Sequence, residues 1–402
     1  MESVCLRDLG STYGGLTGKS KADFGQGSAT FVTFREVIKS AHLREPVLEH
    51  VNVRPGERQN AIARGDILFN GSSEMPDELA LSAVVDFNPS PSTYLNSFCF
   101  GYRLSDPRVE PAYVSYFFRS PAGRELIVTL AQGSTRYNIA KRKFLNIAIP
   151  VPDRHSQREI VSALADADSY IVALEAAVAK QANIRSGLAQ QLLTGGTRLP
   201  GFDRPWAQMR IADLLMPRSE RNALAEPLEV LSCSKHLGFV RSLDYFRNQV
   251  FSRDLSGYRV IHRGDIGYPA NHIEEGSIGV QEIVDRGLVS PIYVVMQPRE
   301  GVDSYFLQRQ LKLDSFRQEF ARATNASVDR RGSLRWRQFS QIVVWAPEPT
   351  EQQAISRVLR DAEAEVAALK RRLEKAKAIK QGMMQELLAG RRRLLVAGEI
   401  AA

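Results

Sequence analysis

Cysteine is scarce in this sequence and forms no motif. Cys5, Cys99 and Cys233 are the only three in 402 residues, and no Cys-x-x-Cys pair is present. An odd number of widely spaced cysteines excludes a regular disulfide framework and lacks the ligand spacing of a structural zinc site.

Long hydrophobic runs are also missing. No apolar stretch approaches the roughly 20 residues that a membrane-spanning helix needs. The first ten residues, MESVCLRDLG, lack the basic-then-apolar layout of a signal peptide. We therefore expect a cytoplasmic protein with no membrane partner.

Common catalytic motifs are absent as well. The nearest string to the N-P-P-Y/F motif of amino methyltransferases, Phe87-Asn88-Pro89-Ser90, lacks the second proline and the aromatic residue. No lysine follows an acidic residue by two positions, as in the D/E-x-K pair of metal-dependent nucleases, and the six histidines show no H-x-x-x-H spacing. We therefore expect no catalytic residues, no metal and no cofactor.

A phosphate-binding loop is suggested by GGLTGKS at 14–20, but the pattern is incomplete. The motif G-x-x-x-x-G-K-S/T needs a glycine where this chain has Tyr13, and it must lie between a buried strand and a helix. The preceding LRDLGST is too short and polar for a central strand, and the following KADFGQG has glycines where the helix should begin. We interpret the stretch as a glycine-rich turn of the first domain.

Positive charge is in excess. The formal net charge is +8, which favours an acidic partner, with nucleic acid as the first candidate.

The chain contains a long internal repeat. The segment that begins at Pro152 aligns without a gap with the segment that begins at Pro347, at an offset of 195 (347 − 152). A period this long indicates a duplicated domain with its helix rather than an array of short repeats. The identical pairs include Gln157 and Gln352, Leu164 and Leu359, Leu174 and Leu369, Leu192 and Leu387, and Gly195 and Gly390.

Each repeated segment has the apolar spacing of a long helix with a coiled-coil seam. Prolines (Pro152, Pro349) precede both segments, and glycines (Gly195, Gly390) follow them, as expected at helix ends. Two narrow seams favour packing of the helices against each other, although each helix packing only on its own domain is the alternative. The predicted seams are Ile160, Leu164, Ala167, Ile171, Leu174, Val178, Gln181, Leu188 and Leu192, and Ile355, Leu359, Ala362, Val366, Leu369, Leu373, Ala376, Met383 and Leu387.

The segments before the helices are related too. ARGDILF at 63–69 returns as HRGDIGY at 262–268, and each copy continues into an apolar stretch, a helical segment, a basic loop and a short strand. The sequence therefore predicts an α/β protein with internal duplication and pseudo-two-fold symmetry: two mixed α/β domains separated by two long antiparallel helices that form a coiled coil. The arginine and aspartate of each RGD are expected to form an internal turn and pair rather than to contact a ligand.

At this point the chain resembles the DNA-specificity (S) subunits of type I restriction-modification systems. The resemblance covers essentially the whole chain, and its most specific segment is LAQQLLTGGTRLPGF at 188–202. The two RGDI copies and the strand-proline-glutamine entry into each helix support it. In the second repeat the run Arg391, Arg392 and Arg393 begins where LLTGGT has its last glycine and threonine, which leaves the role of that tip open.

The resemblance implies a non-catalytic protein of a methyltransferase and endonuclease complex. Each target-recognition domain would bind one half of a bipartite double-stranded DNA target, and the conserved helices would space the halves. The implied partners are methyltransferase (modification) subunits, two of them, which dock on the helices, and restriction subunits reached through the complex. The implied boundaries are 1–152 and 197–348 for the recognition domains, and 153–196 and 349–395 for the conserved helices.

The basic loops before the helices are the candidate DNA contacts. Arginine, lysine and hydroxyl groups contact phosphates, whereas arginine on guanine and asparagine on adenine recognise sequence. A solvated basic turn with its aromatic residue in the core remains the alternative. The candidates are Lys19, Ser20, Ser134, Thr135, Arg136, Tyr137, Asn138, Lys141, Arg142 and Lys143 in the first domain, and Arg330, Arg331, Arg335, Trp336 and Arg337 in the second.

A charged face beside the second seam is the candidate partner-binding surface. It consists of Arg371, Arg372, Lys375 and Lys377. Two functional alternatives stay open at this point: a helical scaffold that assembles partner proteins without sequence-specific DNA recognition, and an enzyme with an unfamiliar site.

Overall fold

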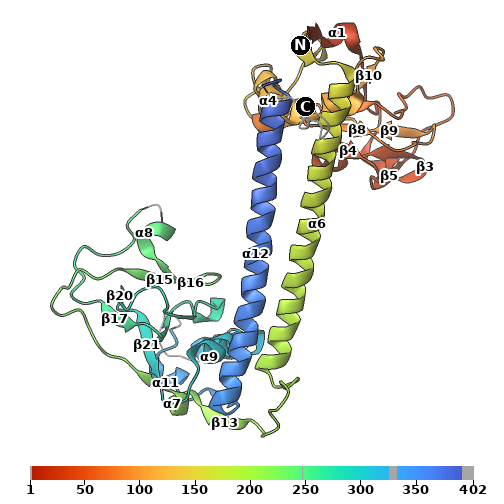
Figure 1. Ribbon diagram of the computed structural model, residues 1–402. Helices are drawn as coiled ribbons and strands as arrows, with labels where there is room; N and C mark the ends of the chain where they lie inside the picture. The colour runs from red at the N-terminus through yellow and green to blue at the C-terminus, as the bar shows by residue number, and fades with distance from the viewer. Residues whose placement is uncertain (1, 247, 326–332, 392–402) are drawn as a thin grey trace, which may run out of the picture. The chain divides into compact units, whose positions relative to one another are not determined.

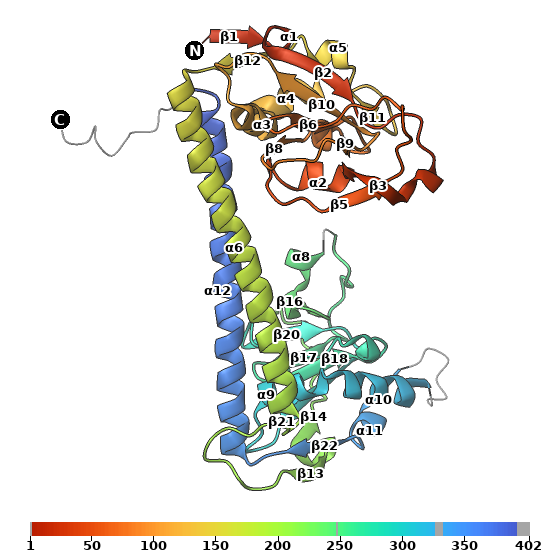
Figure 2. The same ribbon diagram turned by 90° about the vertical axis from the view of Figure 1, so that its right-hand side faces the viewer.

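The computed structural model describes residues 2–246, 248–325 and 333–391, which fall into two compact units. The first unit contains residues Met1–Ala176 and Lys370–Ala402, and the second contains Ala177–Leu369. Both long helices, α6 (Arg154–Leu193) and α12 (Pro349–Leu387), contribute a segment to each unit (Figures 1 and 2). No described helix is both long and apolar enough to cross a membrane.

The first unit is built on a five-stranded sheet with the order β2-β10-β6-β8-β4. Its pairs are antiparallel except for β4 and β8. Helix α3 packs on β6 and β8, and small two- and three-stranded sheets flank this layer. The elements are β1 (Glu2–Cys5), α1 (Leu6–Leu9), β2 (Gly10–Gly14), η1 (Lys21–Asp23), β3 (Phe24–Val32), α2 (Phe34–Lys39), β4 (His42–Leu43), β5 (Leu48–Val51), β6 (Ile67–Asn70), β7 (Ser72–Ser73), η2 (Pro76–Glu78), β8 (Ser82–Val85), β9 (Thr93–Leu95), β10 (Cys99–Leu104), α3 (Pro111–Arg119), α4 (Pro121–Val128), β11 (Tyr137–Asn138), α5 (Lys141–Phe144) and β12 (Ala148–Val151).

The second unit repeats this plan with a four-stranded antiparallel sheet, β14-β21-β18-β19. The hairpin β15–β16 and the pairs β17–β20 and β13–β22 complete it. The elements are β13 (Ala207–Arg210), α7 (Ile211–Leu214), β14 (Leu215–Pro217), β15 (Leu231–Ser234), β16 (Gly238–Arg241), α8 (Ser242–Tyr245), β17 (Arg259–His262), β18 (Ile266–Pro269), η3 (Ile273–Glu275), β19 (Gly279–Val280), β20 (Arg286–Val289), β21 (Tyr293–Pro298), α9 (Ser304–Leu311), α10 (Asp314–Asn325), α11 (Trp336–Phe339) and β22 (Val343–Ala346).

A pair of aromatic rings occupies the same place in both cores. The Phe69 and Phe144 ring centroids are 4.9 Å apart in the first unit, and those of Tyr268 and Phe339 are 4.8 Å apart in the second. All four side chains are less than 2 % exposed. Because such pairs stabilise a core by about 0.5–1.5 kcal/mol beyond their buried area, this contact joins the RGDI strand firmly to the short helix that precedes the long one.

The long helices run antiparallel within each unit, as the seams predict. In the first unit, Leu164 near the start of α6 shares a core with Leu388 at the end of α12, and Leu174 packs with Leu373 and Ala376 farther along. In the second unit, Leu192 at the end of α6 packs with Leu359 near the start of α12. The alternative in which each helix packs only on its own domain is therefore wrong.

The end of α6 is held by an ion pair to the start of α12. Arg198, in the loop that follows LLTGG, donates two hydrogen bonds of 2.6 Å to the Glu351 carboxylate, which is 1 % exposed. Gly195 and Gly390 end the two helices with φ values of +72° and +69°, a backbone region that favours glycine. The LLTGGTRL segment is thus a structural joint of the second unit.

The repeated glutamines connect each long helix to the preceding domain in the same way. Gln157 accepts a hydrogen bond from the Glu110 backbone N–H (2.8 Å) and donates to the Pro152 carbonyl (2.8 Å). Gln352 accepts from the Asp303 N–H (3.0 Å) and donates to the Pro347 carbonyl (2.8 Å). Both glutamines are buried, which explains the proline-to-glutamine spacing of the repeat.

The RGD turns are internal, but the expected arginine–aspartate pairing within each turn is wrong. Asp66 accepts from the Ala63 N–H (2.8 Å), as a turn residue does, and its ion-pair partner is Arg103 at 2.6 Å. Arg64 instead lies 3.2 Å from Asp86. The aspartate is 1 % exposed, so its partner has to come from a neighbouring strand inside the sheet.

In the second unit, the cation that pairs with the buried aspartate comes from a different strand. Asp265 accepts from the His262 N–H (2.8 Å) and pairs with Arg218 at 2.7 Å, while Arg263 pairs with Asp285 at 2.9 Å. Arg218 directly follows β14, the strand equivalent to β2, whereas Arg103 is on the neighbouring β10. The duplicated sheets therefore keep the buried carboxylate and change the strand that supplies its cation.

We predict that the Gln157 junction contributes measurably to stability. Gln157→Leu leaves the Glu110 N–H and the Pro152 carbonyl without their partner, which should lower the free energy of unfolding by about 1–3 kcal/mol. The measurement is urea unfolding of the purified protein followed by circular dichroism. Gln190→Leu is the matched control, because Gln190 is exposed on the same helix. Equal unfolding midpoints for the two variants would show that the junction contributes nothing.

Candidate nucleic-acid interface

The two basic loops are anchored at equivalent positions beside the central strands. Ile139 donates its N–H to the Gly71 carbonyl (3.4 Å), just after β6, and Leu334 donates to the Ala270 carbonyl (2.9 Å), just after β18. Both side chains are buried, and their numbers differ by the repeat offset of 195 (334 − 139). Each loop is therefore fixed at the end of a central strand of its sheet.

The first loop presents most of its predicted DNA contacts to solvent. Tyr137 is half-buried against the core and pairs through β11 with β7, which supports the alternative interpretation for this one aromatic residue. The other loop candidates are exposed: Ser134, Thr135, Arg136, Asn138, Lys141, Arg142 and Lys143.

Two of these cations lie against other loops and strands of the same unit. The Arg136 guanidinium carbon is 5.1 Å from the centre of the exposed Phe98 ring. The Lys141 ammonium lies beside Gly14 at the end of β2, since a Cβ added there would be 3.4 Å from Nζ. The structure therefore brings the pre-helix loop together with the start of the glycine-rich turn and with the residue before β10.

Lys19 is engaged inside the glycine-rich turn. Its ammonium donates to Glu57 and to the Asn52 carbonyl, both at 2.6 Å, and its side chain is 4 % exposed. This contact lowers the pKa of the Glu57 carboxyl to about 2. A phosphate would have to compete with Glu57 for Lys19, so the structure favours an internal role for this lysine.

Ser20 is exposed and begins a 3₁₀ turn rather than an α-helix. Its hydroxyl lies 2.8 Å from the Asp23 carboxylate, and the chain continues into β3. Because a phosphate loop requires the N-terminus of a helix at this point, the structure supports the interpretation of GGLTGKS as a turn.

The second loop places its described candidates on and before the short helix α11. Arg335 is exposed at the start of α11, Arg337 is exposed on it, and Trp336 is half-buried against the core, with its ring 6.4 Å from Phe339. Arg330 and Arg331 lie outside the described residues.

Arg335 and Trp336 line an open groove of about 840 Å³ in the second unit. Three further lining residues were missed from the sequence: Arg218, Arg259 and Ile292. Burial and the neighbouring Arg221 lower the pKa of the Arg259 guanidinium. A groove with several cations and an indole ring can accept an anionic ligand that also has flat apolar surfaces, and nucleic acid fits that description.

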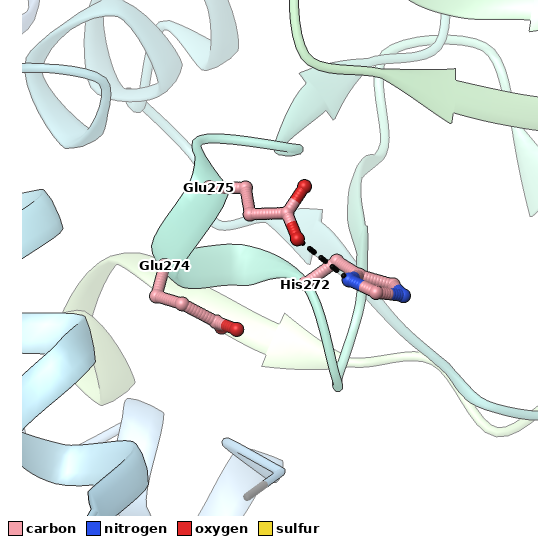
Figure 3. A group of neighbouring side chains, drawn as sticks. All are labelled: His272, Glu274 and Glu275. Carbon is pink, nitrogen blue, oxygen red and sulfur yellow. Dashed lines mark hydrogen bonds and ion pairs between the residues drawn. The ribbon is translucent and has the colours of Figure 1, made fainter.

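A histidine and two carboxylates lie beside this groove. His272, Glu274 and Glu275 each offer one ligand atom within 4.8 Å of the others, and they form the one such group among the residues that the structure describes. His272 Nδ1 and the Glu275 carboxylate form a hydrogen bond of 3.0 Å, in which Glu274 takes no part (Figure 3). All three belong to or adjoin the short turn η3 and are exposed or half-exposed, so the group is explained as a polar turn at the rim of the groove.

The four predicted partner contacts on α12 divide into two kinds. Arg372 donates to the Tyr170 hydroxyl on α6, and Lys377 pairs with Glu175 at 2.9 Å, a hydrogen bond that raises the pKa of the Lys377 ammonium. Arg371 and Lys375 are exposed and, within the described part of the chain, make no hydrogen bond or ion pair. Arg372 and Lys377 thus join the helices, whereas Arg371 and Lys375 are available to a partner.

Comparison with known proteins gives a match in structure. No protein-family model and no curated protein matches the chain. The crystal structure of a type I restriction-modification S subunit from M. genitalium is similar with a TM-score of 0.57 and 14 % identity, covering 96 % of each chain. The HsdS subunit from Thermoanaerobacter tengcongensis is similar with a TM-score of 0.50 and 16 % identity, covering 97 % of this chain and 96 % of that one.

A third structure gives the same result. It is described as the basis of complex assembly and conformational transition of the type I R-M system, and it matches with a TM-score of 0.56 and 14 % identity over 96 % of this chain and 97 % of that chain. Over nearly its whole length, the chain therefore has the fold of the S subunits of type I restriction-modification systems.

Proposed function

We propose that the protein is the DNA-specificity subunit of a type I restriction-modification complex. In this proposal the domains 1–152 and 197–348 each recognise one half of a bipartite double-stranded DNA target. The segments 153–196 and 349–395, which contain α6 and α12, set the spacing of the halves and dock methyltransferase subunits. The observation that carries the proposal is the duplicated domain, in which one basic loop is anchored at the end of the equivalent central strand in each copy.

The equivalent loop positions divide into shared and different residues. Arg136 aligns with Arg331 and Arg142 with Arg337 at the repeat offset of 195 (337 − 142), so these positions are cationic in both copies. Lys141 aligns with Trp336, so this position differs. Shared cations suit phosphate contacts, which carry no sequence information, whereas different residues suit the recognition of two different half-sites.

The chemistry of methylation and cleavage belongs, in this proposal, to the partner subunits. This chain supplies recognition, and the restriction subunits join through the assembled complex. The fold likeness supports a non-catalytic role. In this proposal the protein acts on DNA in the cytoplasm.

We predict that the two halves of the target are recognised independently. The protein, purified with its methyltransferase subunits, should select a bipartite sequence from randomised DNA in a mobility-shift experiment. Replacing residues 200–345 with the corresponding domain of a relative should then change one half of the selected sequence and leave the other intact, because the exchange keeps both helices. Selection of no sequence at all would favour the scaffold alternative, and a change in both halves would contradict two independent domains.

We predict that the exposed cations of α12 bind the methyltransferase subunit. Arg371→Glu combined with Lys375→Glu should weaken co-purification on the order of tenfold, a change of 1.4 kcal/mol, without changing thermal melting. The matched control is Arg35→Glu combined with Lys39→Glu, an exposed pair with the same i, i+4 spacing on α2. Co-purification that is unchanged in the α12 variant, or equally reduced in the control, would assign Arg371 and Lys375 to ordinary solvated surface.

We predict that helix length determines the preferred spacer. Seven residues added to each helix, after Ala176 and after Leu369, keep the heptad seam in register and lengthen each helix by about 10 Å. The preferred spacer should therefore grow by about three base pairs at roughly 3.4 Å per pair, with both half-sites unchanged. The measurement is methylation mapping over a library of spacer lengths.

The control for this experiment is an insertion of two residues at the same points. It rotates the seam by about 200° and should damage folding. A heptad variant that folds, methylates and still prefers the parental spacer would show that the helices do not set the spacing.

A further inference from the structure

An exposed apolar residue occurs at the same structural position in both domains. Phe98 precedes β10 and is 54 % exposed, and Ile292 precedes β21 and is 44 % exposed. The carbonyl of Phe98 accepts from the Gly71 N–H (2.8 Å), and that of Ile292 accepts from the Ala270 N–H (3.3 Å). The strand registers agree, since Cys99 pairs with Asn70 and Tyr293 with Pro269. The two positions are therefore equivalent by hydrogen bonding.

At this position the hydrogen bonds to the rest of the domain are made by the backbone, not by the side chain. Both residues hold the carbonyl bond to the residue after the RGDI strand, and the Phe98 N–H donates to the Asn96 side chain at 2.9 Å. A large side chain that is half exposed contributes little to its core. Substitution at either position should therefore leave the fold intact.

Each apolar side chain has at least one cation in its neighbourhood. The Arg136 guanidinium is 5.1 Å from the Phe98 ring centre, and the Lys141 ammonium lies by Gly14, whose strand partner is Phe100, two residues after Phe98. Ile292 shares its groove with Arg259, Arg335 and Trp336, and Arg259 Nε donates to the carbonyl of the preceding Pro291 at 3.2 Å. In each domain, one apolar group thus projects from a basic surface.

DNA is the ligand whose chemistry matches this arrangement. A duplex presents phosphates to cations, and in its grooves it presents base edges and thymine methyl groups to apolar side chains. Exposed apolar area in water is unfavourable until such a surface covers it. The same combination occurs in both copies although the side chains differ, as expected if the two domains contact different half-sites.

We propose that Phe98 and Ile292 are apolar base contacts, each acting in the half-site of its own domain. The Phe98 ring contacts a base edge or a thymine methyl group while Arg136 holds the adjacent backbone, and Ile292 makes the same kind of contact from the groove. This inference rests on the proposed DNA-specificity function and extends it to two residues that carry no charge.

The test measures affinity of the complete complex for the selected bipartite duplex. Phe98→Ser should weaken binding about tenfold, as expected for the loss of one specific base contact, and Phe98→Trp, which keeps a large apolar side chain, should bind nearly as well as the parent. The loss should vanish on a duplex with its first half scrambled and persist when the second half is scrambled. Ile292→Ser should show the reverse dependence. The matched controls are Val47→Ser and Leu224→Ser, which change exposed apolar residues of the same domains (68 % and 86 % exposed).

Three outcomes overturn the inference, and they differ in what they say about the function. If the Phe98 and Ile292 variants bind like the controls while the parent selects a bipartite target, the proposed function stands and the base contacts do not exist. If the loss is independent of which half is scrambled and methyltransferase co-purification falls in parallel, these residues contact a protein partner. If the parent selects no target, the inference fails together with the proposed function.

Discussion

The rest of the structure depends on one kind of contact: in each unit, the end of one long helix packs into the core that contains the start of the other long helix. Leu388, directly after α12, lies in the core around Leu164, and Leu192 of α6 lies in the core around Leu359. Each buried leucine contributes about 1.5–3 kcal/mol of transfer free energy. Each unit therefore holds a segment of both helices in antiparallel order, and the leucines of the LLTGG and LLAGR segments belong to domain cores rather than to free tips.

The two domains share the contacts that hold them together and differ in other side chains. The glutamine junction, the aromatic ring pair and the loop anchor occur at equivalent positions in both copies. The buried aspartate of the RGD turn is also kept, but its cation moved from β10, as Arg103, to the end of β14, as Arg218. A frame that tolerates this exchange can hold two different binding surfaces, and that is what recognition of two unlike half-sites requires.

The candidate interface shows the same division between anchored and free groups. Of the cations that the sequence suggested, Lys19, Arg372 and Lys377 have partners inside the protein, while Arg136, Lys141, Arg142, Arg371 and Lys375 face solvent. Charge alone does not separate these groups, because the sequence does not show which lysine lies beside a carboxylate and which one faces water. Phe98 and Ile292 were missed for a related reason: an apolar residue next to a strand is ordinarily assigned to the core.

The sequence by itself determined the features that depend on neighbours along the chain. Heptad spacing, a proline at or shortly before the start of each helix, a glycine shortly after its end, and the gapless repeat predicted α6 and α12, because helix periodicity and capping act over a few residues. Only the tertiary structure decided which groups meet across the sheet. The partner of Asp66 is 37 residues away and that of Asp265 is 47 residues away, and both depend on which strands pair. Side-chain exposure follows from the same pairing, so the candidate interface could be identified only when the strands and loops were placed side by side.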